Sequence, residues 1–139
     1  MNILLVEDNP ADARLVLEAV QTGRVPTQLH VVGDGLAALA FLRREGDAAT
    51  APRPDLILLD LNLPKKHGWE VLAAVKAEPS LRRIPVIILT STQAEHEVQR
   101  GYDLGAAAYC VKPQDLDDYL NLIHTLTEFW GRHVRLAVG

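Results

Sequence analysis

The sequence predicts an α/β protein in which a doubly wound parallel β-sheet carries helices on both faces. Five short apolar runs alternate with five longer segments of helical period. The runs are four to six residues long and mostly free of charge, which is typical of parallel strands buried on both faces. Right-handed crossovers place the connecting helices on both sides of such a sheet, so this order of segments indicates the layered fold.

The strands are expected where the apolar runs occur, and the segments between them are expected to be helical. The strands are predicted at residues 3–6, 29–32, 56–61, 86–89 and 108–111. The helices are predicted at residues 11–22, 36–44, 69–78 and 95–104, with a fifth from 116 to about 133. Apolar residues recur three and four positions apart in these segments, as in an amphipathic helix.

Several boundaries are marked by residues that start or stop helices. Asn9 precedes Pro10, which puts a capping side chain before a proline at the first helical position. Asp115 can cap the fifth helix, and Gly105 follows the fourth helix where a left-handed residue fits. Residues 45–54 are rich in Ala, Gly and Pro and form one loop-like insertion between the second helix and the third strand.

Length, composition and charge restrict the class of protein. The 139 residues, 48% of them apolar, suit a single domain over residues 1–139 that ends in an extended helix and tail at about 116–139. The formal charge of -4 gives no basic field for nucleic acid, so we expect a divalent cation and no direct nucleic-acid partner.

The one cysteine, Cys110, lies in an apolar run and is expected in the core. The apolar start is too short for a signal peptide or a membrane span, which predicts a cytoplasmic protein without membrane contact.

Polar groups follow four of the five predicted strands. Glu7 and Asp8 follow the first strand, Asp60 ends the apolar part of the third, Thr90 follows the fourth and Lys112 follows the fifth. Functional groups of open α/β sheets gather at the carboxyl ends of the strands, so we expect these side chains to meet. Taken singly, each has an ordinary explanation, such as an acid near a helix N-terminus or a solvated lysine.

Converging carboxylates favour a cation. Three of them repel one another unless a positive charge offsets the repulsion, and Mg²⁺ prefers oxygen ligands and takes only one or two protein carboxylates. The candidate direct ligands are Asp8 and Asp60, with Glu7 acting through water and the backbone carbonyl of Asn62 completing the set. A hydroxyl at Thr90 and an ammonium at Lys112 would then contact a phosphoryl group. Asp60 is the candidate nucleophile that takes up this group.

Four motifs, LLVEDNP, LILLDLNLP, IPVIILTS and AAAYCVKP, occur in this order in the chain. Together they resemble the receiver domain of two-component response regulators over about residues 2–123. The resemblance implies a flavodoxin-like (βα)5 fold with strand order 2-1-3-4-5. It also implies Asp60 as phospho-acceptor, Mg²⁺ held by Asp8, Asp60 and the Asn62 carbonyl, and phosphoryl contacts from Thr90 and Lys112.

The resemblance further implies how the chain would work. A sensor histidine kinase would phosphorylate Asp60 in a Mg²⁺-dependent reaction, and the aspartyl phosphate would hydrolyse slowly. The chain would be a signalling protein and no enzyme beyond self-catalysed phosphotransfer and autodephosphorylation. Thr90 and Tyr109 would be the switch residues, Asn62 and Thr92 would tune the lifetime, and the bond before Pro113 would be cis.

Other features are similar to stand-alone regulators that partner bacterial phytochrome histidine kinases. These features are the 45–54 insertion, the start VEDNPAD and the segment RGYDLGA, and they predict a phytochrome kinase as partner. The turn PKKHG departs from many receivers, because Lys65, Lys66 and His67 make it basic. This charge either steers a phosphorylated donor or is simply solvated. His67 is a candidate phosphoryl contact or pH-sensitive neighbour, although a loop histidine usually is neither.

The fifth helix carries two apolar ridges. One contains Tyr119, Ile123 and Trp130, and on another side Leu122, Phe129 and Leu136 are seven residues apart. One explanation is a wide core-facing stripe that ends in a frayed tail. The other is a symmetric homodimer through helix four, strand five, helix five and the tail, with Leu122, Phe129, Trp130 and Leu136 as the face.

Three other functions compete with a phosphorylatable signalling module. A degenerate receiver would bind partners without phosphorylation, but the acids, threonine and lysine are all present. A Mg²⁺-dependent phosphatase of the haloacid dehalogenase type has a second aspartate two places after its nucleophile, where this chain has Asn62. A flavodoxin-like cofactor binder would need a phosphate loop after the first strand, and none follows it.

Overall fold

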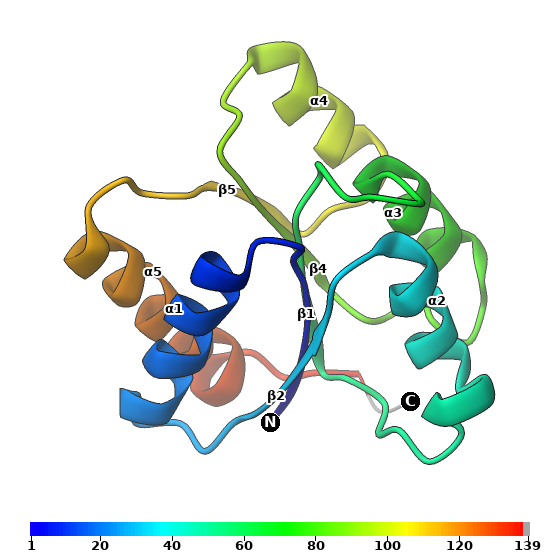
Figure 1. Cartoon of the computed structure of the whole chain (residues 1–139), viewed down its shortest axis with the longest axis horizontal. Helices are drawn as coiled ribbons and strands as arrows, with labels where there is room; N and C mark the ends of the chain where they lie inside the picture. Colours follow the sequence, from blue (N-terminus) through cyan, green and yellow to red (C-terminus); the bar gives the residue numbers. More distant parts are fainter. Residues whose placement is uncertain (138–139) are drawn as a thin grey trace.

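The computed structural model describes residues 1–137 and has a five-stranded parallel sheet (Figure 1). The strands are β1 (Asn2–Val6), β2 (Gln28–Val32), β3 (Leu56–Leu59), β4 (Val86–Thr90) and β5 (Ala108–Val111). They are arranged in the order β2-β1-β3-β4-β5. The doubly wound fold and its predicted strand order are therefore confirmed.

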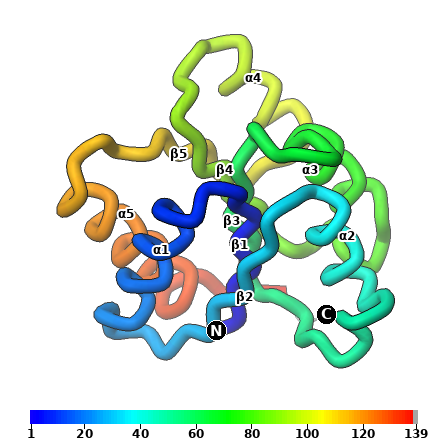
Figure 2. The backbone as a smooth tube through the Cα atoms, in the orientation of Figure 1, coloured from blue at the N-terminus to red at the C-terminus, as the bar shows by residue number. Residues whose placement is uncertain are grey.

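Helices cover both faces of this sheet (Figure 2). They are α1 (Pro10–Thr22), α2 (Gly35–Arg43), α3 (Gly68–Ala77), α4 (Glu95–Asp103) and α5 (Leu116–Glu128). A 3-10 turn, η1 (Gly46–Ala48), lies in the 45–54 insertion, and a π-helical turn, η2 (Phe129–His133), extends α5. Within residues 1–137 no helix has the length and apolar character needed to cross a membrane.

The capping residues act as their positions predict. The Asn9 side chain accepts hydrogen bonds from the backbone N–H groups of Ala11 and Asp12, and Asp115 accepts one from the N–H of Asp118. Gly105 follows α4 with a φ of +101°, which favours glycine because it has no Cβ. The predicted third strand was too long, because the chain turns after Leu59 and the N–H of Leu63 bonds the carbonyl of Leu61.

Two apolar clusters lie on opposite faces of the sheet. Alternate residues of β1, β3 and β4 point to α2 and α3 on one side, and the others point to α1 and α5 on the other. Each fully buried Leu or Ile contributes roughly 1.5–3 kcal/mol to the free energy of folding. The three central strands thus hold the sheet rigidly at the edge where Glu7, Asp60 and Thr90 emerge.

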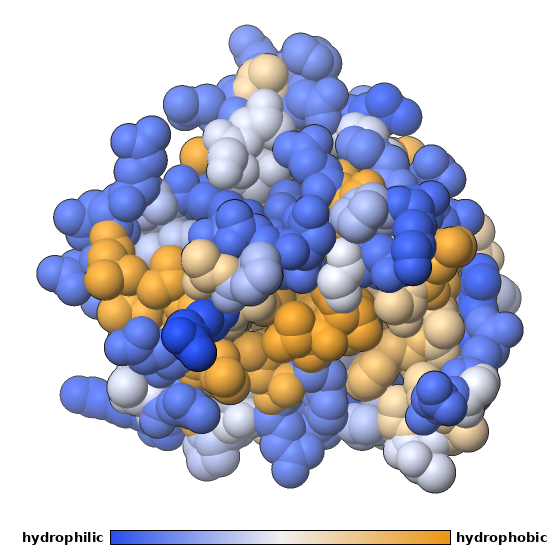
Figure 3. Space-filling model, viewed as in Figure 1, coloured by the Kyte–Doolittle hydropathy of each residue, from blue (hydrophilic) through white to orange (hydrophobic). Residues whose placement is uncertain are grey.

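The expectation that every strand is buried on both faces was wrong for the edge strands. Residues of β2 and β5 are partly or fully exposed, because each pairs with only one neighbour. Val31 of β2 is 48% exposed, and apolar side chains gather over β2 between α1 and α2 on the face seen in Figure 3. Cys110 of β5 is accordingly half-buried, packed against the cluster beneath α1 and α5.

Two expectations near the C-terminus were also wrong. The Lys112–Pro113 bond is trans, as are all peptide bonds of the described residues, in keeping with the intrinsic trans preference of X-Pro bonds. Leu136 does not continue the helical ridge of Leu122 and Phe129, because the helical chain ends at His133. It instead lines a groove of its own chain beside Pro54 and Pro85. The last two residues of the expected 116–139 tail lie outside the described part.

Candidate functional site

Three acids meet at the carboxyl edge of the sheet. Glu7 and Asp8 follow β1, and Asp60 follows β3, the neighbouring strand. One carboxylate oxygen from each lies within 4.8 Å of those from the other two. Glu7 and Asp60 are buried and Asp8 is exposed. The sheet therefore brings together residues that are 52 positions apart in the chain.

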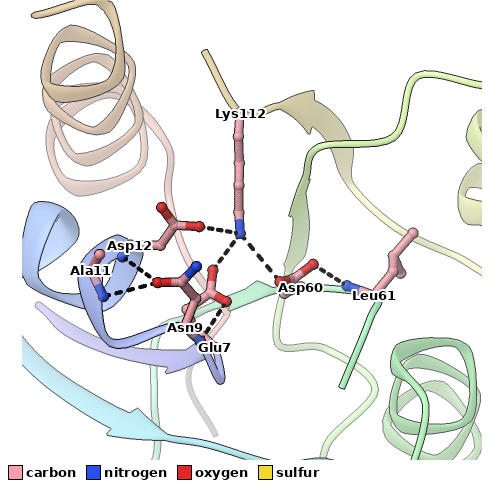
Figure 4. A network of polar contacts seen from close by, with 7 residues as sticks. All are labelled: Glu7, Asn9, Ala11, Asp12, Asp60, Leu61 and Lys112. Carbon is pink, nitrogen blue, oxygen red and sulfur yellow. Dashed lines mark hydrogen bonds and ion pairs between the residues drawn. The ribbon is translucent and has the colours of Figure 1, made fainter. Parts of the chain in front are cut away.

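Lys112 joins this acidic cluster from the end of β5 (Figure 4). Its Nζ lies 2.5 Å from Oε1 of Glu7, 2.9 Å from Oδ2 of Asp12 and 3.2 Å from Oδ2 of Asp60. The Lys112 side chain is only 8% exposed, so these ion pairs are weakly screened by solvent. The other oxygen of Asp60, Oδ1, accepts a hydrogen bond from the N–H of Leu61 at 2.7 Å.

Asp12 is a site residue that the sequence reasoning missed. It lies in the first turn of α1, whereas the strand-end rule points only to residues that directly follow strands. Its position three residues after the capping Asn9, whose side chain accepts from the N–H of Asp12, marks it only as a first-turn residue. Acids are common in first turns because they favour the helix dipole, so its contact with Lys112 had no separate signature.

The cluster shifts the pKa values of its members in different directions. Burial raises the pKa of Glu7 to about 7, and Asp60 adds to the rise while Lys112 opposes it. Burial also acts to raise the pKa of Asp60, but the contacts with Glu7 and Lys112 outweigh it, so this pKa lies below its usual value. The pKa of Lys112 is raised by Glu7, Asp12 and Asp60 against the effect of burial. Asp60 is therefore an ionised carboxylate at neutral pH, as a nucleophile must be.

Thr90 and Tyr109, the predicted switch pair, are both close to this edge. Thr90 ends β4, is fully buried, and has a hydroxyl without a hydrogen-bond partner among residues 1–137. Burying an unpaired hydroxyl costs free energy, which favours a ligand that would accept from it. The Tyr109 hydroxyl donates to the backbone carbonyl of Thr92 at 2.8 Å. The predicted switch residue of β5 is therefore hydrogen-bonded to a residue that is predicted to tune the lifetime.

The turn between β3 and α3 carries the remaining predicted residues. Asn62 is exposed in this turn, directly after the buried Asp60 and Leu61. His67 accepts a hydrogen bond from the N–H of Trp69 at its Nδ1 and so caps α3. Lys65 forms an ion pair with Asp34 at 3.5 Å. The structure thus gives His67 a helix-capping role and directs the Lys65 side chain to α2.

The predicted dimer residues are divided between core and surface. Leu122 and Trp130 are half-buried and pack against the cluster beneath α1 and α5. Phe129 is 52% exposed and meets Trp130 edge to face, with ring centres 5.7 Å apart. Of the four, Phe129 alone offers a large exposed apolar side chain next to α5.

The donor set fits a hard divalent cation. Three carboxylate oxygens within 4.8 Å of one another can surround one ion, and the Lys112 ammonium supplies a donor beside them. Thr90 ends the neighbouring strand β4, and its backbone carbonyl accepts from the N–H of Lys112 at 2.8 Å. A phosphoryl group attached to the Asp60 carboxylate would lie at the same sheet edge as a cation-binding cluster and two side-chain donors. This arrangement suits phosphoryl uptake by a carboxylate better than acid–base hydrolysis, because Asn62 cannot donate or accept a proton as an acid would.

Comparisons with known proteins agree with this geometry. The family model of the response regulator receiver domain matches residues 3–124. The response regulator Rcp1 of Synechocystis sp. is 47% identical over 137 residues, which cover 99% of this chain and 93% of Rcp1. The crystal structure of the Mn²⁺-bound form of Rcp1 is similar with a TM-score of 0.93 at 46% identity, covering 99% of both chains. That of the phosphorylated cyanobacterial phytochrome response regulator RcpA has a TM-score of 0.95 at 46% identity, covering 99% of this chain and 98% of RcpA.

Proposed function

The chain belongs to the response regulator receiver family, and on this premise we propose that it accepts a phosphoryl group on Asp60 in a Mg²⁺-dependent reaction. The observation that carries the proposal is the buried contact of Lys112 with Glu7, Asp12 and Asp60 at the sheet edge where Thr90 ends β4. We further propose that residues 1–139 form one receiver domain. Its output would be a change in a binding surface and not turnover of a substrate.

The roles of the residues follow from their positions. An oxygen of Asp60 forms the new bond to phosphorus, and the bond from phosphorus to the donor breaks, leaving the electron pair on the donor. A bound Mg²⁺ would neutralise charge on the phosphoryl oxygens, held by Asp8 and Asp60, by Glu7 through water and by the Asn62 carbonyl. Lys112 would pair with one phosphoryl oxygen and Thr90 would donate to another. Exposed Asn62 and half-buried Thr92 would govern access of water and so the lifetime of the product.

Intact-mass spectrometry with acetyl phosphate tests the acceptor. Wild type incubated with Mg²⁺ and acetyl phosphate is expected to gain the mass of one phosphoryl group, in a form that is labile to base. Asp60→Asn is expected to gain none, because an amide is a poor nucleophile and cannot form the acyl phosphate. Asp55→Asn, which alters a carboxylate that bonds the N–H of Asn2 far from the cluster, is the matched control and should label as wild type does. Equal labelling of wild type and Asp60→Asn would contradict the assignment.

The proposed donor is a phosphohistidine of a sensor histidine kinase, and specifically of a bacterial phytochrome. The similarity to RcpA, a phytochrome response regulator, and to Rcp1 supports this partner. A purified phytochrome kinase is expected to label Asp60 to different extents in its two light states. Labelling that ignores light would contradict the phytochrome partner and leave the phospho-acceptor intact.

The Thr90 hydroxyl allows a test that needs no kinase. Thr90→Val keeps the shape of the side chain and removes a buried hydroxyl that has no partner. The free energy of unfolding of the unphosphorylated protein is therefore expected to stay equal or to rise by up to about 1–2 kcal/mol. The stabilisation that phosphorylation gives to wild type is expected to be smaller in the variant. Thermal unfolding with and without acetyl phosphate measures both, and a destabilised unphosphorylated variant would contradict this account.

Two alternatives remain as competitors to this function. A receiver that binds partners without phosphorylation would fail the acetyl phosphate experiment while still binding a kinase. A Mg²⁺-dependent phosphatase would release phosphate repeatedly from small phosphomonoesters, which the Asn62 position disfavours. No phosphate release above the rate of a single slow hydrolysis is expected.

We also propose a symmetric homodimer through α4, β5 and α5. Large apolar side chains are exposed on each of these elements or at their ends, namely Tyr102, Val111, Leu116 and Phe129. Phe129→Ser is expected to shift the protein toward the monomer in light scattering, because a central aromatic anchor is lost. Leu36→Ser, which alters an equally exposed side chain on α2, is the control and should leave the mass unchanged. A monomeric wild type would contradict the dimer.

A further inference from the structure

Helix α4 is held by few contacts of its own. It begins after Ala94, whose side chain makes no capping hydrogen bond, and most of its residues are polar or charged. Gly101 is the buried residue of this helix. Figure 1 shows α4 at the outer end of the molecule, next to α3. A helix with so little buried apolar surface belongs to the less stable part of a fold, so its position depends on the groups that neighbouring elements place beneath it.

Aromatic rings from α3 and β5 supply that support. A methyl group added at Gly101 would lie 3.1 Å from Cδ2 of Tyr109 and 3.6 Å from Cη2 of Trp69, and 2.8 Å from Cδ1 of Ile88 on β4. One residue earlier, the guanidinium carbon of Arg100 lies 5.3 Å from the centre of the Trp69 ring. Trp69 is buried at 6% exposure, and a guanidinium over an indole face is attractive. Trp69 therefore contacts α4 at two consecutive residues.

The first residue of α3, Gly68, lies against the backbone of Asp60, the proposed acceptor. The N–H of Trp69 donates to Nδ1 of His67 in the turn after β3. A methyl group at Gly68 would lie 2.6 Å from the backbone oxygen of Asp60, so Gly68 and Asp60 are in direct backbone contact. Trp69 therefore directly follows a residue that packs on the backbone of Asp60, and its ring lies beneath α4.

From this arrangement we propose that Trp69 and Arg100 are positioning residues that couple α4 to the Asp60 turn. This route starts from the backbone after β3, whereas the route through Thr90 and Tyr109 starts from β4, and the two meet at Gly101 of α4. The inference rests on the proposed function, because it describes how cation binding or phosphorylation at the same site would change the position of α4. Coupling free energies are reciprocal, so weakening the contact of Trp69 with Arg100 must also change how tightly the acidic cluster holds a cation.

The test uses the full chain with Trp130→Phe, which leaves Trp69 as the one tryptophan. Mg²⁺ affinity is measured by calorimetry, the environment of Trp69 by fluorescence, and the protection of the α4 amides by hydrogen exchange with and without Mg²⁺ or acetyl phosphate. The variant is Arg100→Met, which keeps much of the length of the side chain and removes its charge. The matched control is Arg82→Met at an exposed arginine after α3.

In Arg100→Met we expect the Mg²⁺ Kd to change by about three-fold or more. The response of the α4 amides to Mg²⁺ and to acetyl phosphate is expected to fall by about half or more. The mass gain at Asp60 is expected to stay as in the parent. Arg82→Met should match the parent in Mg²⁺ affinity, in the response of the α4 amides and in mass gain. A contact that only stabilised α4 would leave the Mg²⁺ affinity unchanged.

The possible outcomes distinguish a failure of the coupling between α4 and the Asp60 turn from a failure of the proposed phosphorylation. An unchanged Mg²⁺ affinity together with a parental α4 response in Arg100→Met would overturn the coupling, whether or not Asp60 is phosphorylated. A parent that binds Mg²⁺ but gains no phosphoryl mass would contradict the proposed function, and the calorimetric comparison would still decide the coupling. A parent that binds neither would overturn both. Trp69→Phe, which keeps an aromatic ring, is expected to give a smaller change than Arg100→Met in the same direction.

Discussion

Replacing Lys112 with methionine is expected to lower the free energy of unfolding at pH 8 without Mg²⁺ by about 3–5 kcal/mol. The Lys112 ammonium contacts the carboxylates of Glu7, Asp12 and Asp60 and is only 8% exposed. Methionine fills much of the same volume but leaves buried carboxylates without a counter-charge, and an uncompensated buried charge is costly. Urea unfolding monitored by circular dichroism measures the loss.

This destabilisation is expected to depend on pH. The pKa of Glu7 is raised to about 7 by burial, and Lys112 opposes the rise, so Glu7 takes up a proton more readily once the lysine is gone. A carboxyl whose pKa is raised on folding gives stability that is present below its unfolded pKa and is lost as pH increases through its folded pKa. The loss in Lys112→Met should therefore be smaller at pH 5.5 than at pH 8. Mg²⁺ should also reduce the loss at pH 8, because it replaces the missing positive charge.

Lys76→Met provides the control for this experiment. The Lys76 ammonium donates to the carbonyl oxygens of Arg82 and Ile84 and, within the described part of the chain, contacts no carboxylate. Its replacement removes a part-buried lysine of the same length without exposing a cluster of acids. We expect a destabilisation of about 1–2 kcal/mol that varies little between pH 5.5 and 8. Equal pH dependence in the two variants would contradict the electrostatic explanation for Lys112.

The parts of the site that sequence could predict are those fixed by strand topology. Asp60 and Lys112 were predicted to meet because parallel strands end at one edge, and their 3.2 Å contact follows from the order β2-β1-β3-β4-β5. This prediction did not require side-chain detail, because a run such as Leu56–Leu59 is apolar enough to fix the strand and its direction. The roles of these residues in phosphoryl transfer stay a prediction.

The parts that sequence could not predict depend on how separate elements approach each other. Asp12 reaches Lys112 because of the angle at which α1 leaves β1, and no residue type marks that angle. The capping role of His67 and the exposure of β2 and β5 have the same origin, since each depends on which neighbour lies alongside. Leu136 shows a different limit, because its seven-residue spacing from Phe129 groups it with a helical ridge although the predicted and the observed helix both end at about His133.

Contacts with the start of α2 hold the turn after β3, which contains Asn62. Asp34 caps α2 through the N–H of Ala37, and its other carboxylate oxygen lies 3.5 Å from Nζ of Lys65. Lys65 adopts a φ of +65°, which a residue with a side chain rarely does without surrounding support. The amino end of α2 thus fixes the path of a turn that directly follows the acceptor.

Gly35→Ala is expected to destabilise the protein by about 2–3 kcal/mol and to weaken Mg²⁺ binding. A methyl group at Gly35 would lie 2.2 Å from the backbone oxygen and 2.9 Å from the backbone carbon of Lys66, and backbone atoms cannot rotate away as a flexible side chain would. The turn must therefore move from α2, and Asn62 moves with it. Gly33→Ala is the matched control, because a methyl group there meets nothing within 4 Å. That variant should be neutral or slightly stabilised, since alanine lowers the entropy of the unfolded chain. Equal urea midpoints and equal Mg²⁺ affinities for the two variants would mean that α2 does not hold the turn in place.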